Sequence, residues 1–111
     1  MEYFYDEIER KESGSTCYFE FQNGKFQDKH WLKDSLYLHA DVFDTYMLYY
    51  LLSDVIKEFD YYGPNEVSKE QWNILVKKSE EKQQWDNIIT ELKAWVEECF
   101  QKYECFTICG I

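Results

Sequence analysis

The chain has 111 residues and a formal net charge of -10, from 22 acidic and 12 basic side chains. This length suits one globular domain over residues 1–111. Aromatic residues make up 20% of the chain, so a small core can bury a large apolar area and disorder is not expected. The negative field repels nucleic acid and anionic lipid, which excludes direct nucleic-acid binding and membrane binding from our expectations.

The amino-terminal residues 1–7 have neither the basic start nor the apolar run of a secretory signal. We therefore expect a cytoplasmic protein with reduced thiols. Residues 1–12 suit either a short amphipathic helix or an irregular arm, and Ser13-Gly14-Ser15 ends this segment.

Two short segments near the chain ends have strand-like residues. Residues 16–21 are β-branched and aromatic, and the turn signal Asn23-Gly24 follows them. After that turn we expect at most a strand stub and then a short helical segment over residues 28–32. Residues 105–109 are the second strand candidate. Whether the two candidates pair is left open.

An uncharged apolar stretch at residues 45–53 is the centre of the predicted fold. Its apolar residues surround the helix on all sides, which predicts a central helix over residues 42–59 that is packed on several sides. A helix that begins at residues 34–35 is expected to lead into it. Gly63-Pro64 predicts the end of the central helix, since Gly suits a C-cap and Pro cannot continue a helix.

The second half of the chain has clear helical signals. Ser68 and Gln71 have the spacing of a capping box, which predicts a helix that starts at Ser68. An i, i+3, i+4 stripe of apolar residues from Trp85 to Tyr103 predicts another helix. The two stripes are out of phase, so we expect a kink or tight turn near residues 80–83.

Together these elements predict a mainly α fold of the α+β class. We expect a compact bundle of three to four helices around the central apolar helix. A small two-stranded β element is expected from residues near 16–21 and 105–109.

The cysteines and histidines show no pattern of a metal or catalytic site. Zinc sites are usually built from paired CxxC or HxxxH elements, and none occurs here. A glycine-rich phosphate loop, a GxSxG elbow and an HExxH helix are also absent from the sequence. We therefore expect no metal, no cofactor and no enzymatic activity. The residues considered were Cys17, Cys99, Cys105, Cys109, His30 and His39.

The acidic excess is concentrated in two tyrosine-containing regions. Residues 41–70 carry seven acids against two bases, and residues 1–12 carry five acids against two bases. Tyrosine supplies contact area at low entropic cost, while carboxylates meet the Lys or Arg of a partner. In the opposite interpretation the tyrosines pack on the core and the acids only keep the domain soluble. Our candidate partner-binding residues are Asp41, Asp44, Glu58, Asp60, Tyr61, Tyr62 and Glu66, followed by Asp6, Glu7 and Glu9.

The chain resembles the immunity proteins of bacterial contact-dependent growth inhibition and polymorphic toxin systems. The resemblance lies in its size and acidity, the Ser68-Lys-Glu-Gln-Trp72 helix start, the amphipathic stretch from Trp85 to Tyr103 and the short ending from Cys105 to Ile111. It includes no diagnostic motif, so no binding residue is carried over. It implies a non-enzymatic protein that binds a cognate toxin, often a basic nuclease, one to one and blocks its substrate-binding surface.

Two other function classes stay open. The first is an acidic nucleic-acid mimic that inhibits a DNA-binding enzyme, which needs acids spaced like phosphates along an elongated surface. The second is a small enzyme or ligand-binding domain, with a pocket between the central helix and the carboxyl-terminal helix that contains Cys99 or His39.

Overall fold

Five antiparallel strands form one sheet in the computed structural model of the chain, which describes residues 1–111. The strand order is β1-β3-β2-β5-β4, so β2 and β5 are inner strands and β1 and β4 are the edges. The strands are β1 (Phe4–Tyr5), β2 (Tyr18–Asn23), β3 (Leu36–His39), β4 (Pro64–Ser68) and β5 (Cys105–Cys109). The helices are α1 (Glu7–Ser13), α2 (Ala40–Thr45), α3 (Leu48–Val55), α4 (Lys69–Ser79) and α5 (Gln83–Cys99).

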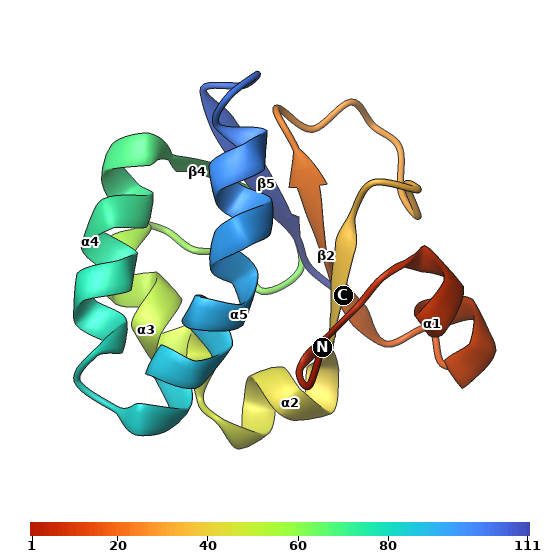
Figure 1. Cartoon of the computed structure of the whole chain (residues 1–111), viewed down its shortest axis with the longest axis horizontal. Coiled ribbons are helices and arrows are strands. Elements are labelled where there is room, and N and C mark those ends of the chain that lie inside the picture. The colour runs from red at the N-terminus through yellow and green to blue at the C-terminus, as the bar shows by residue number, and fades with distance from the viewer.

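One face of the sheet is apolar and carries the core. Figure 1 shows α3, α4 and α5 together on one side of the sheet, with α1 at the opposite end of the molecule. Phe19 and Phe21 of β2 and Ile108 of β5 belong to a cluster of 22 buried apolar residues on this face. The three helices contribute Leu48, Leu51, Leu52, Trp72, Leu75, Ile88, Ile89, Leu92 and Val96 to the cluster.

The other face of the sheet is polar, and it holds the long segment of residues 24–35. Thr107 donates its hydroxyl hydrogen to the carbonyl of Gly24 at 2.8 Å. Gln22 donates from its side chain to the carbonyl of Lys29 at 2.7 Å. Glu20 accepts the backbone N–H of Trp31 and of Leu32, both at 2.8 Å. These three side chains are polar and buried, so they need hydrogen-bond partners. The backbone of the irregular segment that covers them supplies those partners.

The predicted fold class is wrong. The structure has a five-stranded sheet with five helices, not a helical bundle with a two-stranded element. Residues 16–21 and 105–109 do lie in strands that pair, with Glu20 opposite Cys109, but these strands are the centre of a larger sheet. The added strands are only two to five residues long. Such short strands depend on their neighbours for stability, so local sequence patterns indicate them poorly.

The predicted central helix is also wrong in its bounds. Two helices, α2 and α3, occupy this stretch, and Met47 separates them with φ 54 and ψ 43, in the left-handed region. Residues 36–39, expected in a leading helix, form β3. Helix α3 ends at Val55, so Gly63 is not a helix C-cap. Pro64 instead begins β4, where an edge strand tolerates the missing N–H.

The helical predictions for the second half are confirmed. Ser68 accepts the N–H of Gln71 at 3.1 Å, and Gln71 accepts the N–H of Ser68 at 2.9 Å, which is the capping box of α4. A turn between Ser79 and Gln83 separates α4 from α5. The helix expected over residues 28–32 is wrong, because this segment is irregular. No helix has both the length and the apolar character needed to cross a membrane.

Candidate functional site

A row of aromatic rings connects the core to the surface around residues 56–63. Phe43 of α2 stacks on Phe19 with ring centroids 4.0 Å apart, and Phe59 stacks on the other side of Phe43 at 6.3 Å. Tyr61 contacts Phe43 edge-on at 5.7 Å. Tyr49 of α3 contacts Phe59 at 5.8 Å. These contacts fix the exposed tyrosines on a buried aromatic base.

Tyr61 is tied to a carboxylate of α2. Its hydroxyl donates to Asp44, with oxygen–oxygen distances of 3.1 and 3.4 Å to the two carboxylate oxygens. Burial raises the pKa of Tyr61, and the hydrogen bond to Asp44 raises it further, so the hydroxyl stays a donor. Tyr62 lies beside it, with ring centroids 5.1 Å apart, and is 75% exposed. In this pair Tyr61 is partly buried and fixed by its hydrogen bond to Asp44, while Tyr62 is exposed to solvent.

Helix α3 adds two exposed tyrosines to Tyr62 and the partly buried Tyr61. Its buried residues are Leu48, Leu51 and Leu52, which form the i, i+3, i+4 stripe of a one-sided helix. Tyr49 and Tyr50 lie off this stripe and are 42% and 63% exposed. The sequence interpretation assigned both to a buried helix, although the leucine stripe was a signal that they face out. We call the set Asp44, Tyr49, Tyr50, Glu58, Asp60, Tyr61 and Tyr62 the tyrosine–carboxylate surface.

The carboxylates of this surface are free of basic neighbours. None of Asp44, Glu58 and Asp60 lies within ion-pair distance of a Lys or Arg. Residues 40–66 contain six acids and only Lys57 as a base. The negative charge of this surface is therefore available to a basic partner.

The segment that carries Asp60, Tyr61 and Tyr62 is held by its own hydrogen bonds. Asn65 accepts the N–H of Asp60 at 2.7 Å and donates to the carbonyls of Asp60 and Gly63 at 2.8 and 3.0 Å. Asp60 in turn accepts the N–H of Tyr62 at 2.9 Å. A surface fixed in this way loses little conformational entropy on binding.

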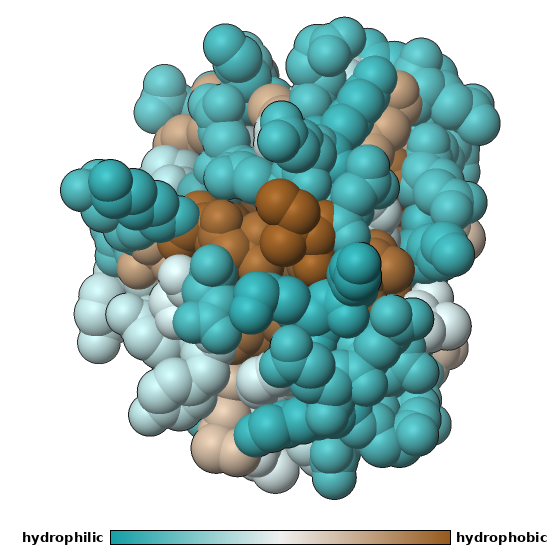
Figure 2. All heavy atoms as spheres, turned by 90° about the vertical axis from the view of Figure 1, so that its left-hand side faces the viewer, coloured by the Kyte–Doolittle hydropathy of each residue, from teal (hydrophilic) through white to brown (hydrophobic).

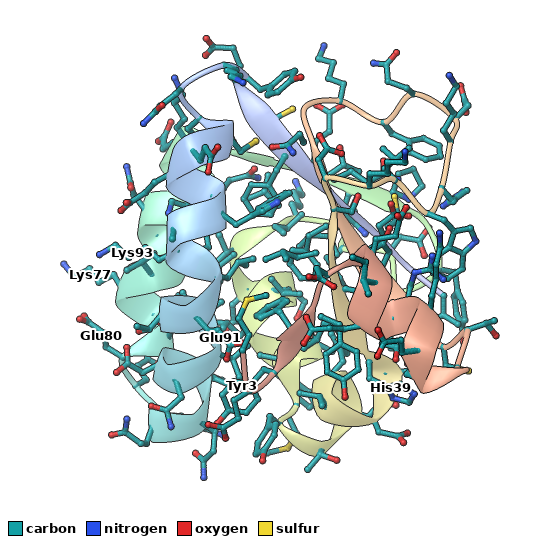
Figure 3. All side chains as sticks on the ribbon, turned by 45° about the vertical axis from the view of Figure 1, so that its right-hand side comes forward. Tyr3, His39, Lys77, Glu80, Glu91 and Lys93 are labelled. Carbon is teal, nitrogen blue, oxygen red and sulfur yellow. The ribbon has the colours of Figure 1, made fainter.

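Asp41 lies one helical turn from Asp44, with its side chain in solvent. His39 accepts the N–H of Asp41 on Nδ1 at 3.0 Å, so this nitrogen carries no proton. The 3.6 Å approach between Nδ1 and the Asp41 carboxylate is therefore not an ion pair. Nε2 of His39 lies 3.0 Å from the Ser15 hydroxyl, which ties the start of α2 to the chain after α1 (Figure 3).

Four predicted residues lie apart from this surface. Glu66 of β4 belongs to the polar face of the sheet, opposite Thr107. The acids of α1 serve that helix: Asp6 accepts the N–H of Glu9 at 2.8 Å, Glu9 accepts the N–H of Asp6 at 3.0 Å, and Glu7 pairs with a lysine one turn on. Capping accounts for Asp6 and Glu9, so their acidity is not evidence of a partner.

Three of the four cysteines are buried, while Cys17 is an exposed free thiol. Burial raises the pKa of Cys99 and of Cys105, and burial together with the charge of Glu20 raises the pKa of Cys109 to about 12. The thiolate is the reactive form, so these thiols are poor nucleophiles. No three His, Cys, Asp or Glu side chains meet in a group that could hold a metal ion.

Other hollows on the surface have mixed lining. A cavity of about 310 Å³ is lined by Cys99, Trp95 and Tyr103, while His39, the other residue expected in a ligand pocket, caps α2. A groove of about 480 Å³ between α4 and α5 includes Lys93, which Figure 3 shows projecting to solvent on the same side as Lys77 and Glu80. Figure 2 shows the α3–α4 side as hydrophilic apart from a narrow apolar strip.

Comparison of the chain with models of protein families, with curated proteins and with solved structures found no match.

Proposed function

We propose that this protein is a non-enzymatic immunity protein that binds a basic toxin domain, a nuclease, in a one-to-one complex and blocks its substrate-binding surface. The observation that carries the proposal is the tyrosine–carboxylate surface. Three exposed tyrosines, Tyr49, Tyr50 and Tyr62, and the partly buried Tyr61 lie there among carboxylates that no Lys or Arg of the chain neutralises. Tyrosine is enriched in protein interfaces, and rigid tyrosines give contact area at low entropic cost.

The mechanism is electrostatic capture followed by occlusion. A nuclease cleft that binds phosphates is lined by Lys and Arg, and the carboxylates of Asp44, Glu58 and Asp60 would take the place of those phosphates. The net charge of -10 would steer the two proteins together before the nuclease reaches its substrate. Such a protein acts in the cytoplasm, where the toxin meets nucleic acid.

The test is inhibition of the nuclease encoded by the neighbouring gene. We expect a one-to-one complex in size-exclusion chromatography and loss of nuclease activity at equimolar ratio. Tyr62→Ala should weaken the complex at least about tenfold, the cost of a typical interface hot spot. The fold should tolerate this change, because the Tyr62 side chain is 75% exposed and contacts the ring of Tyr61 edge-on.

The matched control is Ile74→Ala, which removes a 46% exposed apolar side chain from α4, outside the proposed surface. We expect this variant to bind as the wild type does. Binding that is lost in Ile74→Ala and retained in Tyr62→Ala would move the interface to α4, and an uninhibited nuclease would contradict the proposed function.

A further inference from the structure

A cavity on the polar face of the sheet contains a buried carboxylate. The cavity has a volume of about 190 Å³ and lies between β2, the end of β5 and the segment of residues 24–35. Its walls include Tyr18, His30 and Trp31, and Glu20 lies at its base with only 3% of its surface exposed. This volume holds several water molecules, so a small polar group fits inside.

Every hydrogen bond to Glu20 comes from a neutral donor. Its Oε1 accepts the N–H of Trp31 at 2.8 Å. Its Oε2 accepts the N–H of Leu32 at 2.8 Å, the hydroxyl of Ser35 at 2.7 Å and, at the longer distance of 3.4 Å, the hydroxyl of Tyr37. Backbone amides can only donate, so both carboxylate oxygens act as acceptors in these bonds. The carboxylate of Glu20 therefore has hydrogen-bond donors within the chain, but none of these donors carries a positive charge.

No cation of the chain neutralises this charge directly. Arg10, the single arginine of the chain, lies over the Trp31 ring at 4.3 Å from its centroid and forms no ion pair with Glu20. The closest basic atom is Nδ1 of the half-exposed His30, which is 3.9 Å from Oε1, too far for a hydrogen bond. Oε1 accepts one backbone hydrogen bond and keeps a free lone pair. Burying an uncompensated charge is costly, so the site suits a cation from outside the chain.

The walls of the cavity favour a cation as well. The ring of Trp31 already attracts one cation, the guanidinium of Arg10, and the aromatic ring of Tyr18 also lines the cavity. Cys109 lies opposite Glu20 in the sheet, and its thiol is neutral because burial raises its pKa to about 12. Trp31 has φ 62, an unfavourable backbone conformation for a bulky residue, and the hydrogen bond from its N–H to Glu20 helps to hold it there.

We propose that this cavity binds a guanidinium or primary ammonium group against the carboxylate of Glu20. Two sources share this chemistry: a free small cation, or an Arg or Lys side chain of a protein partner. The second source rests on the proposed function. A partner side chain could reach the cavity, because the cavity borders the tyrosine–carboxylate surface. Two residues that line the cavity bond to the segment of that surface: Ile111 donates its N–H to the carbonyl of Tyr61 at 3.3 Å, and Gly110 donates its N–H to the carbonyl of Gly63 at 3.0 Å.

The first test needs no partner. The protein is titrated with methylguanidinium chloride, with methylammonium chloride, and with methylurea as a neutral molecule of nearly the same shape as methylguanidinium, at constant ionic strength, while amide and indole NMR signals are followed. We expect saturable shifts at Trp31 and Gly110 with the cations, and binding at least about tenfold weaker for methylurea. Equal shifts with methylurea, or none with either cation, would overturn the proposal.

Two variants locate the site. Glu20→Gln removes the charge, and we expect it to abolish the saturable shifts. Trp31→Leu keeps the carboxylate and removes an aromatic wall, and should weaken cation binding severalfold. If Glu20→Gln does not fold, Trp31→Leu and the comparison with methylurea still test whether the cavity binds a cation. Unchanged affinity in Trp31→Leu would place the cation elsewhere and overturn the assignment.

A competition experiment identifies the source of the cation. If a partner side chain enters the cavity, methylguanidinium at saturating concentration weakens the complex with the nuclease, and Trp31→Leu weakens it too. If the complex is indifferent to both, the natural ligand is a free small cation. Failure of the nuclease test leaves the titration with methylguanidinium intact, so the two proposals fail separately.

Discussion

The carboxylate of Glu91, on α5, accepts the backbone N–H of Tyr3 with both oxygens, at 3.0 and 3.1 Å, although 88 positions separate the two residues. Figure 3 shows Glu91 and Tyr3 lying together between α5 and the start of the chain. Glu91 also accepts the N–H of Phe4 at 3.2 Å. Since β1 is an edge strand, this carboxylate occupies amides that would otherwise stay open to another strand.

Glu91→Ala should destabilise the protein by about 1.5–3 kcal/mol, because it removes a charged acceptor from two backbone amides. Alanine keeps the helix propensity of α5, so the loss reflects the anchor of β1. The measurement is the free energy of unfolding from urea titration. Glu97→Ala is the control on the same helix, with an exposed carboxylate, and should stay within about 0.5 kcal/mol of wild type. Equal losses in both variants would show that the anchor contributes nothing.

Met47→Gly should stabilise the protein. Met47 is exposed and has φ 54, and a left-handed conformation costs a non-glycine residue about 1–2 kcal/mol. Glycine removes that cost. It also loses more conformational entropy on folding, which costs about 0.5–1 kcal/mol, so we expect the free energy of unfolding to rise by about 0.5–1 kcal/mol in total. The control is Tyr50→Gly inside α3, where glycine should destabilise by about 1 kcal/mol. A loss of stability in both variants, measured by thermal unfolding, would contradict the assigned conformation of Met47.

Local signals predicted the second half of the fold well, because its helices depend on contacts between close neighbours in sequence. The capping box of Ser68 and Gln71 involves residues three apart, and the stripe from Trp85 to Cys99 repeats on one helix face. The sheet was missed for the opposite reason. Strand β1 has two residues and is fixed by Glu91, and β4 begins with a proline, so neither has a local signature.

Five of the seven residues of the tyrosine–carboxylate surface were predicted from the sequence, all except Tyr49 and Tyr50. Charge density along the chain indicated Tyr61 and Tyr62, which are neighbours in one irregular segment, and Asp44 of α2, which the fold brings to the Tyr61 hydroxyl. Tyr49 and Tyr50 were missed because an apolar stretch was interpreted as a helix buried on all sides. The Glu20 cavity was beyond sequence reasoning. It requires a strand residue, a loop more than ten positions later and the end of β5 to meet.

Alkaline pH should destabilise the protein through its buried thiols. Burial, with a further effect of the Glu20 charge, raises the pKa of Cys109 from 9.0 to about 12. Between these values the unfolded chain has lost a proton that the folded chain keeps, so the free energy of unfolding falls as pH rises from about 9 to about 12. The pKa of Tyr37 is raised by burial and by Glu20, which acts in the same direction.

Cys109→Ala should reduce this pH dependence while lowering stability near neutral pH, because a buried side chain is lost. The measurement is the urea midpoint at about pH 7 and at about pH 10, for both proteins. The gap between wild type and variant should narrow at the higher pH. A gap that is the same at both pH values would show that the Cys109 thiol does not titrate between folded and unfolded states as expected.

The position of the negative charge, and not its total, should control how fast the nuclease is captured. The double variant Asp44→Lys/Glu58→Lys reverses two charges of the tyrosine–carboxylate surface, and Glu70→Lys/Glu97→Lys reverses two exposed charges on α4 and α5. Both variants have a net charge of -6, since each reversal adds two to -10. We expect the association rate measured by stopped flow to fall about tenfold in the first variant, with a flatter dependence on salt, and by much less in the second. The same rate in both would mean that only net charge matters, and that Asp44 and Glu58 do not face the nuclease.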